Sequence, residues 1–113
     1  MKRGEIWTAA GGSVYGAKPR PVVILQDDRF DATGSITVCP LTSDPTTAAL
    51  FRVPLEPSVD NGLRARSYVM TDKVVSIPRT RIRDRIGRLN EGDVVSLNRA
   101  IIVFLGLAGS NGR

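Results

Sequence analysis

Before the last quarter of this chain, every apolar segment is only four to seven residues long. Glycine, proline and Asp-Asn-Gly turn signals separate the segments, and several alternate apolar with polar residues, which is typical of β-strands. Pro54 marks its segment as an edge strand, because proline cannot donate to a strand ladder. The predicted strands are Arg3–Ala9, Pro21–Gln26, Ser35–Cys39, Phe51–Leu55, Ser67–Met70 with Val74–Ile77 (two short strands or one bent strand), and Ile86–Leu89.

The stretch after Asn90 has the spacing of an amphipathic helix. Asn90 predicts an N-cap, and two acidic residues follow it in the first turn. Gly106 and Gly109 predict the end of the helix. The apolar stripe that we expect to face the core consists of Val94, Leu97, Ile101 and Leu105, widened by Val95, Ala100 and Phe104.

Many short strands followed by one helix predict a mainly β fold, a small SH3-like barrel with a C-terminal helix. A length of 113 residues suits one domain, and 42% hydrophobic residues can form a buried core. We find no linker or internal repeat. We therefore expect one barrel domain over residues 1–109 and a loose tail over residues 110–113.

Features that direct a chain to a membrane or out of the cell are not found in this sequence. No apolar run approaches the roughly 18 residues of a membrane span, and Met1–Glu5 has no apolar segment of a secretory signal. The single cysteine, Cys39, cannot form an intramolecular disulfide, and its apolar neighbours predict a buried thiol. A reducing cytoplasm is the expected location.

The chain contains no histidine, which excludes histidine triads, Cys-His pairs and histidine zinc sites. The net charge is +5, and 13 of the 16 basic residues are arginine. Arginine has a planar guanidinium group that binds phosphate in a bidentate manner and stacks on bases. The balance favours nucleic-acid binding, although an arginine-rich codon usage is an alternative cause.

Three segments carry candidate anion-binding groups. Prolines on both sides of Arg20 stiffen the backbone at the start of a central strand, which suits a cation positioned for phosphate. Thr42 follows a strand end and offers a hydroxyl donor, and Ser13 lies among glycines whose N–H groups can approach an anion. The alternatives are a solvated arginine, a turn-capping threonine and a merely flexible loop.

Basic residues also gather between Arg79 and Arg88, preceded by Arg64 and Arg66. At strand spacing, the arginines at 79, 81, 83 and 85 would share one face and could follow a nucleic-acid backbone. An acidic protein partner and a solvated face are equal alternatives. Tyr15 is the best candidate for base stacking, and the aspartates at 27, 28 and 31 are better explained as a solvated turn than as a metal site.

Five motifs in order resemble the MazF/PemK type of toxin from bacterial toxin–antitoxin pairs. No single motif is specific, but the ordered set is, and it covers about residues 2–107. The matching segments are Arg3–Trp7, Arg20–Leu25 followed by Gln26–Asp28, Val38–Thr42, Ser67–Asp72, and Val75–Ile77 with Arg81–Ile82. Ile86–Gly87 and the end of the helix at Leu105–Leu107 complete the match.

The resemblance implies an SH3-like barrel of the PemK/CcdB type, a cytoplasmic homodimer and a metal-independent endoribonuclease without a cofactor. Such toxins cut single-stranded RNA, usually within a short sequence, to a 2′,3′-cyclic phosphate and a 5′-hydroxyl. An antitoxin with a disordered acidic tail blocks them. By the family pattern, Arg20 would stabilise charge on the scissile phosphate and Thr42 would hydrogen-bond it. The expected RNA contacts are Ser13, Tyr15, Lys18, Asp72, Lys73, Arg79 and Arg81.

The sequence departs from the family pattern in the first loop. Val14 stands where many members have an acid, and no carboxylate occurs between Gly11 and Gln26. Arginine is a poor general base, so the base is open among Arg20, Lys18 and Asp72. Lys73 also replaces the usual glutamine. Two alternatives follow: a barrel that binds RNA without cutting it, and a toxin that inhibits a protein such as gyrase, which the Arg20 and Thr42 motifs argue against.

Overall fold

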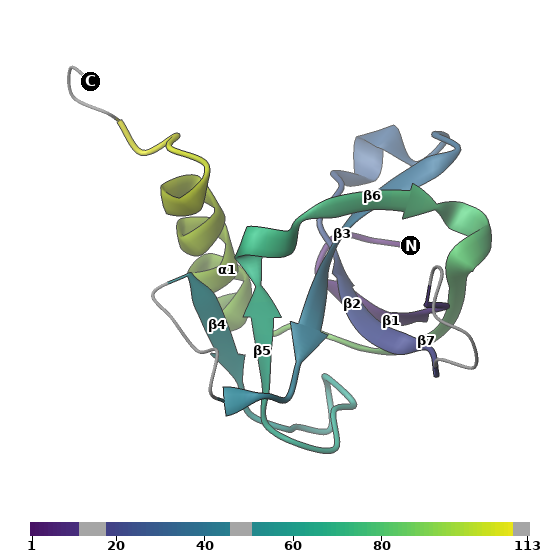
Figure 1. Ribbon diagram of the computed structural model, residues 1–113, viewed down its shortest axis with the longest axis horizontal. Helices are drawn as coiled ribbons and strands as arrows, with labels where there is room; N and C mark the ends of the chain where they lie inside the picture. Colours follow the sequence, from purple (N-terminus) through teal and green to yellow (C-terminus); the bar gives the residue numbers. More distant parts are fainter. Residues whose placement is uncertain (12–17, 46–50, 110–113) are drawn as a thin grey trace.

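The computed structural model describes residues 1–11, 18–45 and 51–109. Within these residues, seven antiparallel strands precede one α-helix, and three short 3-10 turns connect them (Figure 1). The strand order is β4-β5-β3-β2-β1-β7, with β6 paired to β3. The elements are β1 (Glu5–Ala9), β2 (Arg20–Ile24), η1 (Asp28–Phe30), β3 (Ser35–Thr42), β4 (Arg52–Leu55), β5 (Ser67–Met70), η3 (Thr71–Lys73), β6 (Val75–Pro78), η4 (Arg79–Arg81), β7 (Ile82–Arg88) and α1 (Glu91–Phe104).

The strands β1, β2, β3, β6 and β7 form the ring on the right of Figure 1, and this ring confirms the predicted barrel with its C-terminal helix. The first half of β3 pairs with β2 on one side and β6 on the other, while β7 follows β6 through η4 and pairs with β1. Burial of apolar side chains within the ring stabilises it. The apolar cluster inside the ring consists of the buried residues Ala9, Val22, Ile24, Ile36, Val38 and Ile77.

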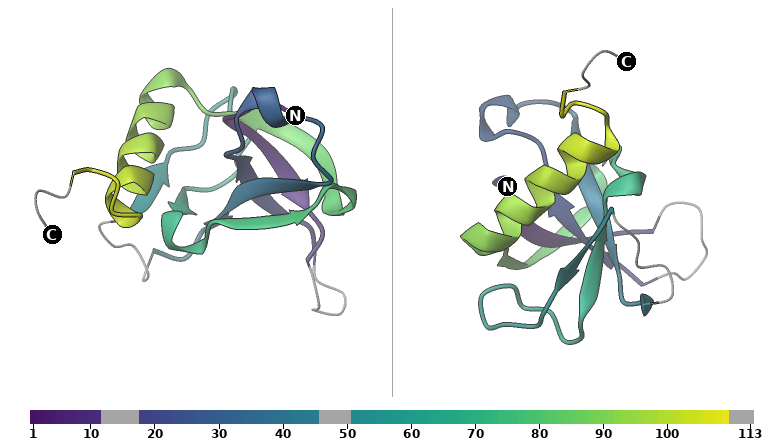
Figure 2. Two further views of the ribbon diagram at one scale, coloured as in Figure 1. Left: turned by 90° about the horizontal axis from the view of Figure 1, so that it is seen from above. Right: turned by 90° about the vertical axis from the view of Figure 1, so that its left-hand side faces the viewer.

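The helix α1 covers a second apolar cluster on the other side of the sheet, and Figure 2 shows it crossing in front of the strands. Leu97 is the buried residue of the helix, and Val94, Ala100 and Ile101 pack around it. The prediction that Val95, Phe104 and Leu105 face the core is wrong, because they are 47%, 44% and 53% exposed. Phe104 instead contacts Phe51, with ring centres 5.3 Å apart.

Both ends of α1 follow their predicted capping signals. Asn90 Oδ1 accepts a hydrogen bond from the Asp93 N–H at 2.7 Å. At the other end Gly106 has a φ of +74°, and the Leu107 N–H donates to the Ile102 carbonyl at 2.8 Å, which forms a Schellman motif. No helix in the described part of the chain is both long and apolar enough to cross a bilayer.

Several strand ends differ from the sequence prediction by one or two residues, and two strands, β3 and β7, extend three or four residues beyond their predicted bounds. Strand β3 continues through Pro40 to Thr42, because β3 changes partner from β2 to β5 at this point and tolerates a residue without an N–H. Strand β7 begins at Ile82, and Arg79 and Arg81 belong to the turn η4. The expected single face of four strand-spaced arginines therefore does not form. The predicted tail, residues 110–113, lies outside the described residues.

Candidate functional site

The strands β2 and β3 separate at the lower edge of the sheet (Figure 1). Their pairing ends at Val22 and Pro40. Beyond this pair, β3 continues against β5, while β2 stays paired with β1. Arg20 and Thr42 each lie two residues beyond the last pair, so strand alternation places both on the sheet face that carries Val22 and Pro40. We call this point the fork.

Arg20 is the first residue of β2 and its side chain is exposed. Pairing with Ala9 and a proline on each side fix its backbone, as the sequence predicted. Within residues 1–11, 18–45 and 51–109, no hydrogen bond or ion pair occupies its guanidinium group. Arg20 therefore presents a fixed, available cation at the fork.

Thr42 closes the other side of the fork, and its hydroxyl is oriented by the next turn. Thr42 Oγ1 accepts a hydrogen bond from the Asp44 N–H at 3.1 Å. Because this bond uses an oxygen lone pair, the hydroxyl hydrogen remains available for a ligand. This bond is the turn-capping contact that the sequence left open as the alternative for Thr42, with Asp44 as the residue that is capped.

Asp72 is held by Arg52 of the neighbouring strand. Arg52 Nε and Nη2 donate to the two carboxylate oxygens at 2.8 and 3.1 Å, and the Arg52 and Asp72 side chains are only 8% and 20% exposed. Burial acts to raise the pKa of the Asp72 carboxyl, but the hydrogen bonds and charge of Arg52 outweigh it and hold that pKa below its ordinary value. A carboxylate bound in this way is a weak proton acceptor. Lys73 follows it and is exposed.

Four arginines of the predicted basic run, at 79, 81, 83 and 85, bind within the chain through their side chains. Arg79 Nε donates to the Thr33 carbonyl, and Arg81 donates from Nε and Nη2 to the Ala10 carbonyl at 3.1 and 3.0 Å. Arg85 forms an ion pair with Glu5, in which Arg85 Nε lies 3.1 Å from Glu5 Oε2. Arg81 thus fixes the stem of the loop between β1 and β2, a role that the charge pattern alone did not reveal. A ligand contact of Arg79 or Arg81 stays a prediction.

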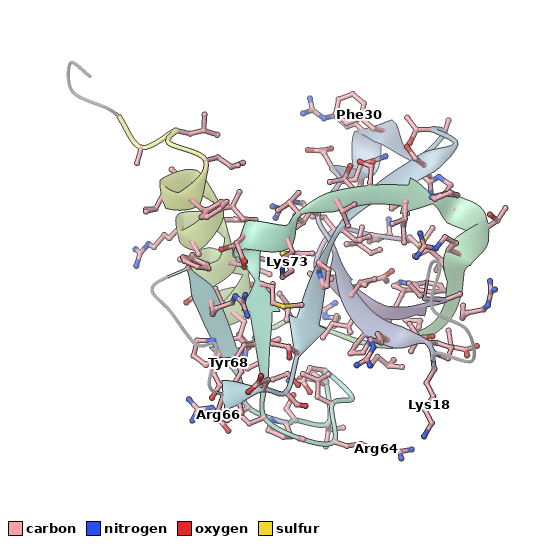
Figure 3. All side chains as sticks on the ribbon, in the orientation of Figure 1. Lys18, Phe30, Arg64, Arg66, Tyr68 and Lys73 are labelled. Carbon is pink, nitrogen blue, oxygen red and sulfur yellow. The ribbon has the colours of Figure 1, made fainter. Side chains whose placement is uncertain are left out.

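Further cations lie at the same lower edge of the molecule as the fork. Lys18 is exposed just before β2, and Figure 3 shows Lys18, Arg64 and Arg66 extending from the lower edge of the molecule. Ser13 and Tyr15, which we predicted as ligand contacts, lie outside the described residues. The parts of the chain that the structure describes contain no group of three or more Cys, Asp or Glu side chains arranged to hold a metal ion.

Comparison with known sequences matches residues 2–105 to a family described as the PemK-like, MazF-like toxin of type II toxin–antitoxin systems. The probable endoribonuclease MazF of Mycolicibacterium smegmatis is 52% identical over 109 residues, covering 96% of this chain and all of the relative. The endoribonuclease MazF9 of Mycobacterium tuberculosis is 31% identical, covering 95% of this chain and 98% of its own length.

Solved structures share the same fold. The Mycobacterium tuberculosis toxin MazF-mt6 superposes with a TM-score of 0.74 at 28% sequence identity, covering 90% of this chain and 96% of its own. A mycobacterial endoribonuclease in complex with its cognate antitoxin superposes with a TM-score of 0.79, covering 97% of this chain and 99% of its own. At 22% identity, the second likeness concerns the fold.

Proposed function

Because this chain belongs to the PemK-like, MazF-like toxins of type II toxin–antitoxin systems, we propose that it is an endoribonuclease that cuts single-stranded RNA within a short sequence and without a metal ion. The observation that carries the proposal is the fork, where an available arginine and an oriented threonine hydroxyl share one sheet face. Relatives at 52% and 31% identity are named endoribonucleases, which supports the assignment.

The proposed reaction uses a nucleophile that RNA itself supplies. The ribose 2′-oxygen attacks the adjacent phosphorus, so that a P–O2′ bond forms while the P–O5′ bond breaks. The 2′ proton is lost to a base, and the leaving 5′-oxygen gains a proton. The products are a 2′,3′-cyclic phosphate and a 5′-hydroxyl. This chemistry needs a group that stabilises negative charge on the phosphorane, and it does not need histidine.

In this proposal, Arg20 and Thr42 stabilise the negative charge on the phosphorane. The Arg20 guanidinium would bind two oxygens of the scissile phosphate, and the Thr42 hydroxyl would donate to one of them. Donors fixed in this way contribute roughly 10²–10³ in rate each at comparable sites. Arginine is a poor general base and Asp72 is bound by Arg52, so the proposal gives neither Arg20 nor Asp72 the role of general base.

The proposal includes the expected partners. Residues 1–109 act as one domain in a homodimer, and a cognate antitoxin inhibits the enzyme by placing acidic residues at the fork. The exposed arginines at this edge of the molecule support this competition, because carboxylates and phosphates bind arginine in the same geometry. A toxin-antitoxin complex is also the subject of a structure with the same fold.

The test is incubation of purified, antitoxin-free protein with a long single-stranded RNA in excess EDTA. We expect discrete fragments with 5′-hydroxyl ends, and a loss of rate of about 10²-fold or more in Arg20→Ala and Thr42→Val. Arg29→Ala is the control, because Arg29 is an exposed arginine in the turn after β2.

Two outcomes would contradict the proposal. RNA that stays intact but is bound by the protein would favour a binding barrel in which Val14 has replaced a catalytic acid. Cleavage that continues at the wild-type rate in Arg20→Ala would remove the fork from the mechanism.

A further inference from the structure

We propose that the segment Glu56–Arg66, which we call the arm, carries a second phosphate-binding site for single-stranded RNA, formed by Arg64 and Arg66 on the β5 side of the fork. The inference rests on the proposed function, because it extends the path of the same RNA beyond the scissile phosphate. Thr42 and Arg20 would bind that phosphate, and the arm would bind the backbone of a neighbouring nucleotide.

Strand pairing brings the arm close to Thr42. Thr42 lies opposite Tyr68 in the β3–β5 ladder, and side chains opposite each other share a sheet face, with Cβ atoms about 5 Å apart. Arg66 Cζ lies 5.5 Å from the centre of the Tyr68 ring. Tyr68 therefore links the fork directly to Arg66. Figure 3 shows the side chains of Tyr68 and Arg66 at the lower end of β5.

The arm is folded around one buried amide. The side chain of Asn61 accepts hydrogen bonds from the N–H groups of Ser58 and Leu63 at 3.0 and 2.9 Å and donates to the Glu56 carbonyl at 2.8 Å. Asn61 is 3% exposed, and the Arg88 N–H binds the Asp60 carbonyl at 2.9 Å, which ties the arm to β7. A segment ordered in this way loses little conformational entropy when it binds a ligand.

The arginines of the arm are available to a phosphate. Arg66 Nε lies 2.9 Å from Glu56 Oε2, but the two side chains are 54% and 69% exposed, and exposed ion pairs contribute little to stability. Arg64 is exposed, and within the described residues no hydrogen bond or ion pair engages it. Two guanidinium groups therefore lie within three residues of each other. The neighbouring carboxylates are Glu56, which pairs with Arg66, and Asp93, which lines the same pocket as Arg66 and Glu56.

The structure also offers a matched control. Arg29 makes the same two contacts as Arg66 far from the fork: its Nε lies 3.1 Å from Asp27 Oδ1, and its Cζ lies 5.5 Å from the Phe30 ring centre. Figure 3 shows Phe30 at the upper edge of the molecule, opposite Arg66. Arg29→Ala therefore removes the same charge and the same kind of contacts as Arg66→Ala.

The experiment measures binding of a fluorescein-labelled, fully 2′-O-methylated single-stranded RNA as a function of salt. This probe has no free 2′-hydroxyl, so the measurement does not depend on cleavage. We expect Arg64→Ala and Arg66→Ala each to weaken binding by about fivefold and to lower the slope of log affinity against log salt by about 0.7. Glu56→Gln should tighten binding, because it removes the competing carboxylate, and Arg29→Ala should match the wild type.

Three outcomes would overturn the inference. Arg66→Ala could bind the RNA as Arg29→Ala does, or Glu56→Gln could bind the RNA less tightly than the wild type does. Alternatively, the arm variants could lose binding to poly-glutamate but not to the RNA, which would assign the arm to an acidic protein partner. If the wild type cleaves RNA while Arg66→Ala binds normally, only the arm inference fails. If the arm variants lose affinity while no RNA is cleaved, only the proposed enzymatic function fails.

Discussion

Replacing Gly87 with alanine tests the contact on which the arm depends. A Cβ atom at Gly87 would lie 2.3 Å from the carbonyl carbon of Asn61 and 2.4 Å from the carbonyl oxygens of Asn61 and Asp60. All three are backbone atoms, so rotation of a side chain cannot relieve the overlap. The arm and β7 must move apart for Gly87→Ala to fold.

The cost can be worked out from the bonds at this contact. Ordinary contact begins near 3.4 Å, so a separation of about 1 Å is required. That movement breaks the hydrogen bond from Arg88 to Asp60, worth about 1 kcal/mol, and strains those of buried Asn61, which cost about 1–3 kcal/mol when lost. We expect a loss of about 2–4 kcal/mol in the free energy of unfolding, which lowers Tm by about 8–16 °C in a domain of this size.

Urea and thermal unfolding, followed by the fluorescence of Trp7 and by circular dichroism, measure this loss. Gly34→Ala is the control, because nothing lies within 4 Å of its added Cβ, and we expect a change of no more than about 0.5 kcal/mol. At temperatures where Gly87→Ala is folded, it should also bind the methylated RNA less tightly. Equal stability of the two alanine variants would refute the reasoning.

Three further predictions concern single side chains. Burial raises the pKa of the Cys39 thiol to about 12, so at pH 8 iodoacetamide should modify Cys39 only after unfolding, and modification of the folded protein would contradict its burial. The pKa of Asp72 is lower in the folded than in the unfolded chain, so its pair with Arg52 stabilises the fold above the ordinary value of 3.8 and is lost as the pH falls through the folded value. In acid titrations, wild-type stability should therefore fall more steeply below about pH 4 than that of Asp72→Asn. Asn90→Ala removes the cap of α1 and should lower stability by about 1 kcal/mol in urea unfolding, whereas Ser96→Ala on the exposed side of the helix should not.

The elements with strong local signals were predictable from the sequence. Asn90 and Gly106 mark the two ends of the helix, and the capping hydrogen bonds there join residues only a few positions apart. The helix prediction is therefore confirmed at both ends. The run of apolar residues after Pro21 likewise indicated a central strand. Phe104 shows the limit of such reasoning, because helical periodicity gives the direction of a side chain but not how much of it the neighbouring elements cover.

The candidate site shows the same division. Prolines around Arg20 and the position of Thr42 after a strand were visible in the sequence, and so were the motifs of the family. The shared face of these residues depends on the β2–β3 register and on the change of partner within β3. The pairing of Asp72 with Arg52 and the bond from Arg81 to Ala10 join residues far apart in the chain, and charge counting could not distinguish them from free cations and anions.

The sequence by itself therefore determined the mainly β class, the capped helix, the family and the residue types available for chemistry without histidine. Those properties depend on backbone preferences and on side chains a few residues apart. Only the tertiary structure decided which arginines are available, how the arm is fixed around Asn61, and where β2 and β3 separate. These properties depend on strand register and on contacts between distant segments, which form together when the barrel closes and have no local signal.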